Sequence, residues 1–326
     1  MIISKTPLRM SFTGGGSDLK EYYQYDFGSV ISTTIDKFIY ITVNKRFTDN
    51  IRVGYSKTEY VENIEDIEHN LVREALKLVD ITKGIDIVYM SDLLPDREGS
   101  GLGASSSLLV GTLNVLHAFK GEMISSEILA KEACKIEIEI LGHPIGKQDQ
   151  YAVSFGGFNY IQFNADESVF VSPIIIKKQT KEQLNKNLLL FYTGINKRSD
   201  STLAEQKRNT KNNISILNKM VELSLELKEV LKNNDITEFG NILHKGWILK
   251  QKLASTITSP ILNSYYEKAI KAGAIGGKIL GSGGGGFFLF YCEEKKQNKL
   301  REALSNLKEI PFKFESQGSR IIYVSD

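Results

Sequence analysis

The sequence is richest in potential chemistry at a loop of glycine and serine, Gly99-Ser100-Gly101-Leu102-Gly103-Ala104-Ser105-Ser106-Ser107, which runs into an apolar stretch. Glycine lets a backbone approach a ligand closely and turn its N–H groups inward. A helix beginning there adds unpaired N–H donors and a partial positive charge. The loop therefore predicts a phosphate cradle whose serine hydroxyls reach phosphate oxygens or magnesium; a flexible, serine-capped turn is the alternative. No Gly-Lys-Ser/Thr follows, so it is not a P-loop, and it does not fit G-x-G-x-x-G.

Two further glycine-rich segments lie far apart in the chain. The first runs from Arg9 to Asp18 and contains Gly14-Gly15-Gly16-Ser17, a tight backbone flanked by charge that a plain hairpin would also explain. The second, Lys278 to Gly286, ends in four consecutive glycines and lies between two apolar stretches. Ordering such a run costs backbone entropy, so its place inside a domain indicates close approach to something and not a linker.

Two carboxylates lie between these segments. Glu137 falls in a predicted helix, and Asp149 follows the turn that contains Pro144 and Gly146. Magnesium-dependent phosphoryl transfer requires one carboxylate for the metal and another that takes or orients the hydroxyl proton. The helix carries other glutamates, so a single carboxylate there is uninformative without its neighbours.

Taken in order, these segments resemble the motifs of the GHMP kinases, the family of galactokinase, homoserine kinase, mevalonate kinase and phosphomevalonate kinase. The resemblance spans residues 7–290. The matching positions are Pro7, Arg9, Gly14 and Asp18 for the first motif, Gly101 to Ser106 for Gly-Leu-Gly-Ser-Ser-Ala, Pro144, Gly146, Asp149 and Gln150 for Pro-x-Gly-x-x-Asp-Gln, and Lys278 to Gly286 for the third motif.

The resemblance implies ATP and Mg²⁺ as cofactors and a role for each matching residue. Asp149 aligns with the candidate base, and Arg9 with an arginine near that base. Ser105 and Glu137 align with the residues that hold magnesium. ATP is expected on Gly99, Ser100, Gly101, Leu102, Gly103, Ala104, Ser105 and Ser106. The substrate is expected on Gly15, Gly16, Ser17, Asp18, Lys147, Arg198, Gly283 and Gly284.

The sequence departs from the galactokinase pattern, because Gly15-Gly16 replaces a Glu-His pair, while Ala104 and Ser106 replace a serine and an alanine. It is more similar to D-glycero-D-manno-heptose 7-phosphate kinases and to the kinase part of the much longer fucokinases. The implied reaction is phosphorylation of the C1 hydroxyl of the heptose 7-phosphate to the 1,7-bisphosphate, for nucleotide-activated heptose. Lys147, Lys197 or Arg198 would then bind the distal phosphate. An unphosphorylated sugar such as L-fucose, or a non-catalytic regulator, are the alternatives.

The elements that must position these residues follow from hydrophobic spacing and cap signals. Strands are expected within 1–60, at 85–90, within 151–176, at 188–193, within 275–292 and at 320–324. Helices are expected at 64–79, 104–118, 125–141, 199–232, 235–252, 260–272 and 294–307. The polar segment 177–187 is interpreted as a linker or surface loop.

This order predicts two α+β domains, 1–178 and 179–326, with a boundary near residue 178. The resemblance adds that the first is like ribosomal protein S5 domain 2 and the second is ferredoxin-like, with the active site between them. The length of 326 residues agrees with two domains of ordinary size.

Composition narrows the class of protein. The net charge is +2 with acids and bases interspersed, too weak a bias to predict nucleic-acid binding. No apolar run approaches the ~18 residues of a membrane span, and the N-terminus lacks a signal-peptide core. Cys134 and Cys292 are interpreted as buried, reduced thiols. We therefore expect a cytoplasmic protein whose partners are a sugar phosphate and ATP; a homodimer is compatible with the sequence.

Overall fold

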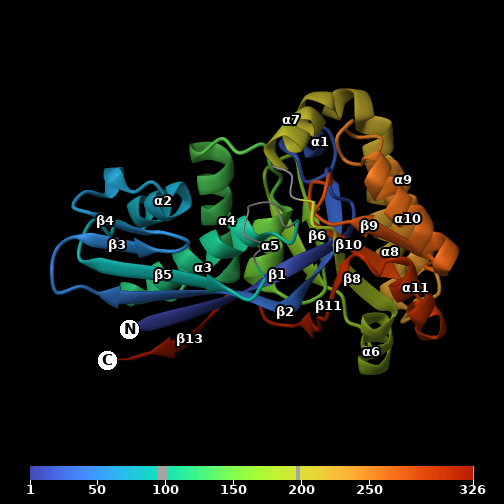
Figure 1. The fold of residues 1–326 in the computed structure, drawn as a ribbon. Coiled ribbons are helices and arrows are strands. Elements are labelled where there is room, and N and C mark those ends of the chain that lie inside the picture. The colour runs from blue at the N-terminus through green and yellow to red at the C-terminus, as the bar shows by residue number, and fades with distance from the viewer. Residues whose placement is uncertain (94–100, 196–198, 326) are drawn as a thin grey trace.

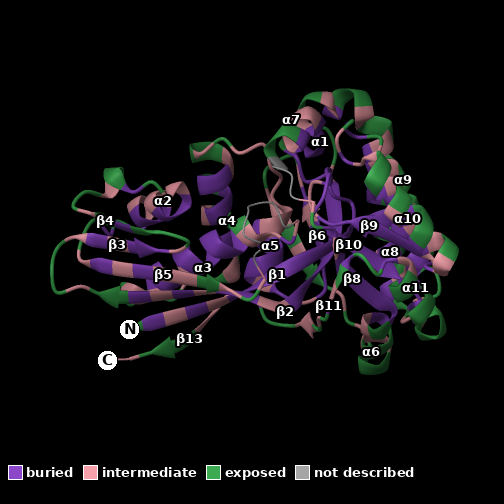
Figure 2. Ribbon diagram, in the orientation of Figure 1, coloured by how far each residue is buried: buried purple, intermediate pink, exposed green. Residues whose placement is uncertain are grey.

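Two β-sheets organise the chain, as Figure 1 shows for this computed structural model, which describes residues 1–93, 101–195 and 199–325. The larger sheet has nine strands and the smaller has four. Helices cover one side of each sheet, and the strands near the middle of the molecule are largely buried in Figure 2. This arrangement confirms the predicted α+β class.

The larger sheet is built around two long strands, β1 (Ile2–Thr13) and β2 (Gly28–Lys45). Its main path runs β13-β1-β2-β5-β3-β4, with β5 at Ile85–Ser91, β3 at Ile51–Gly54 and β4 at Thr58–Val61. Strands β6 (Asn159–Phe163) and β7 (Val169–Pro173) extend it from β2. The pairing of β3 with β5 is parallel, and the other pairings are antiparallel.

Helix α3 (Ala104–Phe119) packs against β1 and β2 and is apolar on nearly every face, which is typical of a helix enclosed by other elements. Around it lie α1 (Lys20–Tyr23), a 3₁₀ turn (Ile64–Asp66), α2 (Asn70–Leu78), α4 (Ser126–Cys134), a π-helical stretch (Lys135–Ile140) and α5 (Gln148–Phe155). The start of α3 is therefore fixed by the core beneath it.

The smaller sheet has the order β11-β8-β10-β9, all antiparallel, with β8 at Leu188–Tyr192, β9 at Gly276–Ile279, β10 at Phe287–Tyr291 and β11 at Lys308–Ile310. This is the split βαβ arrangement of a ferredoxin-like domain, as expected. Between β8 and β9 come α7 (Ser199–Asn209), a 3₁₀ turn (Thr210–Asn213), α8 (Ile214–Lys232), α9 (Phe239–Lys250) and α10 (Pro260–Ala272). A 3₁₀ turn (Glu294–Lys296) and α11 (Gln297–Ala303) connect β10 to β11.

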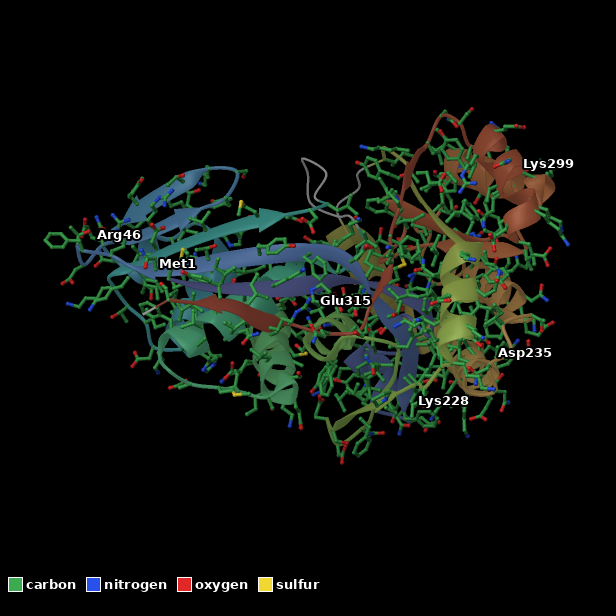
Figure 3. The ribbon with its side chains drawn as sticks, turned by 90° about the horizontal axis from the view of Figure 1, so that it is seen from below. Met1, Arg46, Lys228, Asp235, Lys299 and Glu315 are labelled. Carbon is green, nitrogen blue, oxygen red and sulfur yellow. The ribbon has the colours of Figure 1, made fainter. Side chains whose placement is uncertain are left out.

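The last segment of the chain returns to the larger sheet. Strand β12 (Phe314–Glu315) pairs with β2, and β13 (Arg320–Val324) pairs with β1. In Figure 3, Glu315 lies where this segment crosses back, far from Lys299 on the helical side. The sheets therefore do not divide at one point of the sequence, and a boundary near residue 178 stays a prediction for the segment that joins β7 to β8.

The core is continuous between the two sheets. Phe12 at the end of β1 meets Phe239 at the start of α9, with ring centroids 5.1 Å apart and planes at 76°. Both side chains are buried. An edge-to-face aromatic pair of this kind adds to the free energy gained from burial. The two halves are thus packed together directly beneath the glycine-rich segment 14–16.

Most predicted elements are confirmed, and α10 and β13 have their predicted bounds. One expectation was wrong: segment 177–187 is not a loop but contains helix α6 (Lys178–Asn187). The strands expected within 151–176 are present and follow a helix that ends at residue 155, and the predicted helical stretch 199–232 contains a 3₁₀ turn at 210–213. Helix α6 is polar on most faces and is held through buried Leu184 and an Asn187 Nδ2 bond to the Tyr291 hydroxyl (3.0 Å).

Both cysteines are free and buried, as predicted. Within residues 1–93, 101–195 and 199–325, none of the helices combines the length and the apolar character that crossing a membrane demands.

Candidate active site

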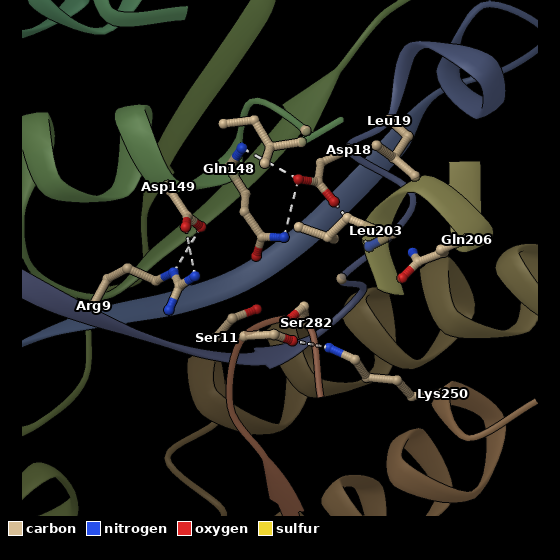
Figure 4. A pocket seen from close by; sticks show the side chains of 15 residues that line it. Arg9, Ser11, Asp18, Leu19, Gln148, Asp149, Leu203, Gln206, Lys250 and Ser282 are labelled. Atoms are coloured by element: carbon tan, nitrogen blue, oxygen red, sulfur yellow. Dashed lines mark hydrogen bonds and ion pairs between the residues drawn. The ribbon is translucent and has the colours of Figure 1, made fainter. Parts of the chain in front are cut away.

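A cavity lies between the two halves of the molecule, and Figure 4 shows the side chains that line it. Its walls come from the end of β1, the loop 15–19, the turn 145–149, helix α7, the last residue of α9 and the loop that follows β9. The glycine-rich segments at 14–16 and 281–286 therefore meet at one site, although residues 17–280 lie between them in the sequence.

Arg9 and Asp149 form a bidentate ion pair in this cavity. Arg9 Nε lies 2.7 Å from Asp149 Oδ1, and Nη2 lies 2.6 Å from Oδ2. The remaining nitrogen, Nη1, donates to the Gly101 carbonyl at 2.6 Å. Such a fork fixes the orientation of the carboxylate as well as its charge. The predicted base and its arginine are thus brought together on β1 and on the first turn of α5.

Glu137 is the centre of a second cluster. Its side chain is buried, and it accepts hydrogen bonds from Ser105 Oγ (2.6 Å), Ser106 Oγ (2.7 Å) and Gln150 Nε2. Burial raises the pKa of Glu137, while these three donors act in the opposite direction. The residue lies in the π-helical stretch after α4, a distortion found often at functional sites.

The N-terminus of α3 has the geometry of an anion cradle. Gly103 is the N-cap with φ of 72°, and no side chain caps the first turn. A side chain on Gly103 would also meet Arg9, because its Cβ would lie 3.0 Å from Arg9 Cγ. Leu102 turns its side chain into the core, and its carbonyl accepts the Arg9 backbone N–H. Gly99 and Ser100, the other predicted ATP-binding residues of this loop, lie outside the described residues.

The donor set at this helix fits magnesium. Ser105 and Glu137 offer a hydroxyl and a carboxylate, the oxygen ligands that Mg²⁺ prefers, and a nucleotide supplies the phosphates. Among the residues that the structure describes, no group of three or more His, Cys, Asp or Glu side chains could hold a metal alone.

Asp18 and Gln148 form the upper wall of the cavity in Figure 4. Asp18 Oδ1 accepts the Gly16 N–H at 2.8 Å, and Oδ2 accepts Gln148 Nε2 at 3.0 Å. Burial raises the pKa of Asp18, and the charge of Asp149 adds to that rise. Gly146 is required here, because a Cβ on it would lie 2.0 Å from Asp18 Oδ2. The predicted substrate residues Gly15, Gly16 and Asp18 all line the cavity.

Other predicted substrate residues do not line it. The Ser17 hydroxyl donates to the Gly14 carbonyl (2.8 Å) and shapes the loop from inside. The Lys147 ammonium pairs with Glu167 and lies over the ring of Tyr23. Gly283 and Gly284 pack on residue 257, where the Gly284 N–H donates to its carbonyl at 2.7 Å. Arg198 and Lys197 lie outside the described residues, and Gly281 and Ser282 line the cavity instead.

The sequence analysis missed several lining residues: Ser11, Leu19, Ile145, Gln148, Leu203, Gln206 and Lys250. Gln148 stands next to Asp149 and could have been included for that reason. Nothing marks Lys250, because a lysine in the last turn of an amphipathic helix usually faces solvent. Here its side chain is buried and its ammonium group donates to the Gly281 carbonyl. Burial lowers the pKa of Lys250 to about 8, and the charge of Arg9 contributes.

Comparisons with known proteins agree with this geometry. The model of the GHMP kinases N terminal domain matches residues 69–157, and that of the GHMP kinases C terminal matches residues 227–309. The chain is 31% identical, over 93% of each sequence, to a D-glycero-alpha-D-manno-heptose 7-phosphate kinase of Campylobacter jejuni.

Solved structures agree as well. The fold superimposes on a D-glycero-D-manno-heptose 1-phosphate kinase from Bacteroides thetaiotaomicron with a TM-score of 0.83, 26% identity and full coverage of both chains. It also superimposes on a putative sugar kinase from Campylobacter jejuni with a TM-score of 0.80 and 28% identity, covering 99% of this chain and 98% of the other.

Proposed function

Because the chain belongs to the GHMP kinase family, we propose that it transfers the γ-phosphoryl group of ATP to the C1 hydroxyl of D-glycero-D-manno-heptose 7-phosphate. The products are ADP and the heptose 1,7-bisphosphate. The observation that carries the phosphoryl transfer is the place of Asp149, which lies between the cradle at α3 and the cavity wall of Asp18. The similarity to the Campylobacter jejuni heptose 7-phosphate kinase supports the choice of sugar.

The residues of the chain divide the reaction between them. The free N–H groups at the start of α3 bind the nucleotide phosphates, beside the hydroxyl of Ser105. Asp149 accepts the proton of the C1 hydroxyl. At the same time the C1 oxygen forms the new bond to phosphorus, and the bond between this phosphorus and ADP breaks. Arg9 holds Asp149 in the orientation that this proton transfer needs, and keeps a positive charge beside the reacting groups.

Ser105 and Glu137 would hold magnesium, which supplies positive charge to the phosphate oxygens when it is bound. Both Glu137 oxygens already accept hydrogen bonds, so the carboxylate is oriented before the ion arrives. The buried position of Glu137 keeps competing water away from this side of the cluster.

The sugar would bind on the other side of Asp149. Asp18 and Gln148 exchange hydrogen bonds with the hydroxyl groups of the sugar. Gly15 and Gly16 have no side chains, so the backbone there leaves room for the sugar ring. Arg198 remains the candidate for the distal phosphate. We further propose a cytoplasmic location, a use of the product in nucleotide-activated heptose, no nucleic-acid or membrane partner, and a homodimer that size-exclusion chromatography with light scattering would test.

An unphosphorylated sugar such as L-fucose is the second candidate. It is favoured by one observation: among the described residues that line the cavity, the cations are Arg9 and Lys250, whereas Leu203 and Gln206, which line it from α7, are uncharged. Neither of these two side chains carries a charge that would bind a distal phosphate.

The deciding experiment is ADP release with Mg²⁺ and ATP over D-glycero-D-manno-heptose 7-phosphate, the unphosphorylated heptose, L-fucose, D-galactose and mevalonate. We expect turnover with the 7-phosphate at a kcat/KM at least about a hundredfold above that of the unphosphorylated heptose, as the loss of a charged contact implies. Equal turnover of the two heptoses would reject the distal phosphate site and leave the kinase. No turnover with any sugar would reject the proposal.

A further inference from the structure

We infer that Lys250 binds the transferred phosphoryl group, as a second cation that the C-terminal half of the chain brings to the reaction. This rests on the proposed kinase activity but not on which sugar is the acceptor. It gives a function to a buried lysine outside the three glycine-rich motifs.

Lys250 is buried without a counter-ion. It is the last residue of α9 and about 5% exposed, and within the described residues its ammonium group donates to the Gly281 carbonyl and pairs with no carboxylate. Burying an ammonium group is costly unless an anion or several acceptors surround it. Lysine has three N–H donors, so two remain for a ligand in the cavity. An anion bound there would recover the lost solvation.

The place of Lys250 identifies which anion. The carbonyl that it binds belongs to Gly281, and this residue is packed on Gly101 so closely that a Cβ on Gly281 would lie 2.4 Å from the Gly101 Cα. Gly101 is also the residue whose carbonyl accepts Arg9 Nη1. Arg9 and Lys250 therefore bind the carbonyls of two touching glycines, one from the phosphate loop and one from the third glycine-rich loop. The charged groups of Arg9 and Lys250 therefore lie on either side of the junction at which the terminal phosphate of the nucleotide would meet the sugar cavity.

The guanidinium of Arg9 is oriented by other partners. Three of its five N–H groups already donate, two to Asp149 and one to Gly101, so its charge is shared with the base. Lys250 keeps free donors at the same junction, and its ammonium points toward Ser11 and Ser282 in Figure 4. Arg9 therefore serves the base, and Lys250 serves the phosphoryl group.

The charge balance of the interior supports this division. Three cations, Arg9, Lys250 and Lys278, are buried around the junction, together with Asp18, and the partly exposed Asp149 lies beside them. The repulsion among them is part of what lowers the pKa of both lysines, after burial itself. Lys278 has its own acceptor, the Phe12 carbonyl at 3.0 Å, and does not line the cavity. Arg9 and Lys250 both line the cavity, and of these two only Lys250 has no ion-pair partner within the described residues.

The test compares the affinity for the Mg²⁺ complexes of ADP and of the β,γ-imido analogue of ATP, in the full-length protein without sugar. Lys250→Met keeps the length of the side chain and removes the charge. We expect it to weaken binding of the ATP analogue by about tenfold or more, the size of a charge-assisted hydrogen bond, and to change ADP binding less than about twofold. Lys278→Met is the matched control, a buried lysine whose loss should leave the ratio of the two affinities unchanged.

Retained ADP binding proves that the variant is folded, and Lys250→Gln repeats the test with a polar side chain. An unchanged ratio in both Lys250 variants would overturn the inference. So would an unchanged ratio together with a raised KM for a phosphorylated sugar only, since Lys250 would then bind the distal phosphate. If wild-type protein phosphorylates no heptose phosphate while the ratio still depends on Lys250, the proposed substrate fails and this inference stands.

Discussion

The two sides of the cavity differ in how far their buried polar groups already have hydrogen-bond partners. On the phosphate side, Glu137 has donors on both oxygens, and these come from α3 and α5, which also form the core around it. On the sugar side, Ser11 Oγ and Gln148 Oε1 are buried and have no hydrogen-bond partner within the described residues. Unpartnered buried polar atoms are uncommon in native proteins and call for an explanation. On the phosphate side the Glu137 carboxylate is therefore oriented before the ligand binds, although Gln150 Oε1 there also has no partner within the described residues. On the sugar side, two polar atoms are left for the ligand.

Asp149 lies at the border of the two sides, and its loss should have the largest effect. Asp149→Asn keeps the shape but removes the proton acceptor, so we expect kcat to fall by about a hundredfold or more, with nucleotide affinity nearly unchanged. Steady-state kinetics and calorimetric nucleotide binding measure the two quantities. Asp166→Asn, an exposed carboxylate between β6 and β7, is the control. Near-normal turnover of Asp149→Asn would remove it from the role of base.

The free energy of unfolding of a Lys250 variant tests the same comparison. Since burial lowers its pKa from 10.5 to about 8, the folded protein below pH 8 holds a buried charge at a cost of about 3 kcal/mol. Between pH 8 and 10.5 the folded state loses this proton before the unfolded state does, and the cost fades. Lys250→Met should therefore raise the free energy of unfolding at pH 7, with a gain that shrinks toward pH 10.5.

Urea unfolding of ligand-free protein at several pH values measures this gain. Lys252→Met, an exposed lysine two residues further along, should show no such trend with pH. A Lys250→Met variant that is less stable than wild type at pH 7 would mean that the charge is favourable without a ligand, and the sugar side would then not be open at this residue.

Replacing Gln148 should weaken sugar binding and leave ATP binding nearly unchanged. Gln148→Leu removes the bond to Asp18 and the unused acceptor Oε1, so we expect the KM for the sugar to rise about tenfold while the KM for ATP stays within about twofold. Initial rates with each substrate varied in turn separate the two. An equal rise in both constants would show that the two sides are not independent.

Ser11→Ala should have the smallest effect. It is still a sharp test, because the ligand-free protein should be as stable or more stable while sugar binding becomes weaker. Its hydroxyl has no partner within the described residues, so Ser11→Ala should leave the ligand-free protein as stable or up to about 1 kcal/mol more stable. The same change should raise the sugar KM by roughly twofold to tenfold, if a sugar hydroxyl completes the bond. A loss of stability with unchanged KM would mean that the hydroxyl serves the fold.

The same contrast explains what the sequence could reveal. The phosphate side was predictable because its residues lie in short motifs, where glycines and serines in Gly101–Ser106 and the turn before Asp149 carry their chemistry locally. Lys250, Gln206 and Leu203 lie on helices whose spacing indicates only which faces are apolar. Their meeting with Asp18 depends on how α7 and α9 pack on the end of β1, a tertiary arrangement without a local signal.

The fold shows the same limit. Helix α6 was mistaken for a loop because its stability comes from Leu184 and Asn187, two contacts with elements distant in sequence, and not from helical periodicity. Lys147 was expected in the site because it is two residues from Asp149, but Glu167 draws its ammonium group away. Proximity along the chain is a guide to position only where the backbone between two residues turns their side chains the same way.

The pairing of β13 with β1 has a consequence for the protein during its synthesis. Strand β1 carries Arg9, and its partner at Arg320–Val324 leaves the ribosome more than 300 residues after it. At about 5–20 residues per second, β1 has one unpaired edge for some tens of seconds during synthesis. An exposed edge of that kind invites pairing with other nascent chains, so chaperones that shield it would matter more for this enzyme than its folded stability suggests.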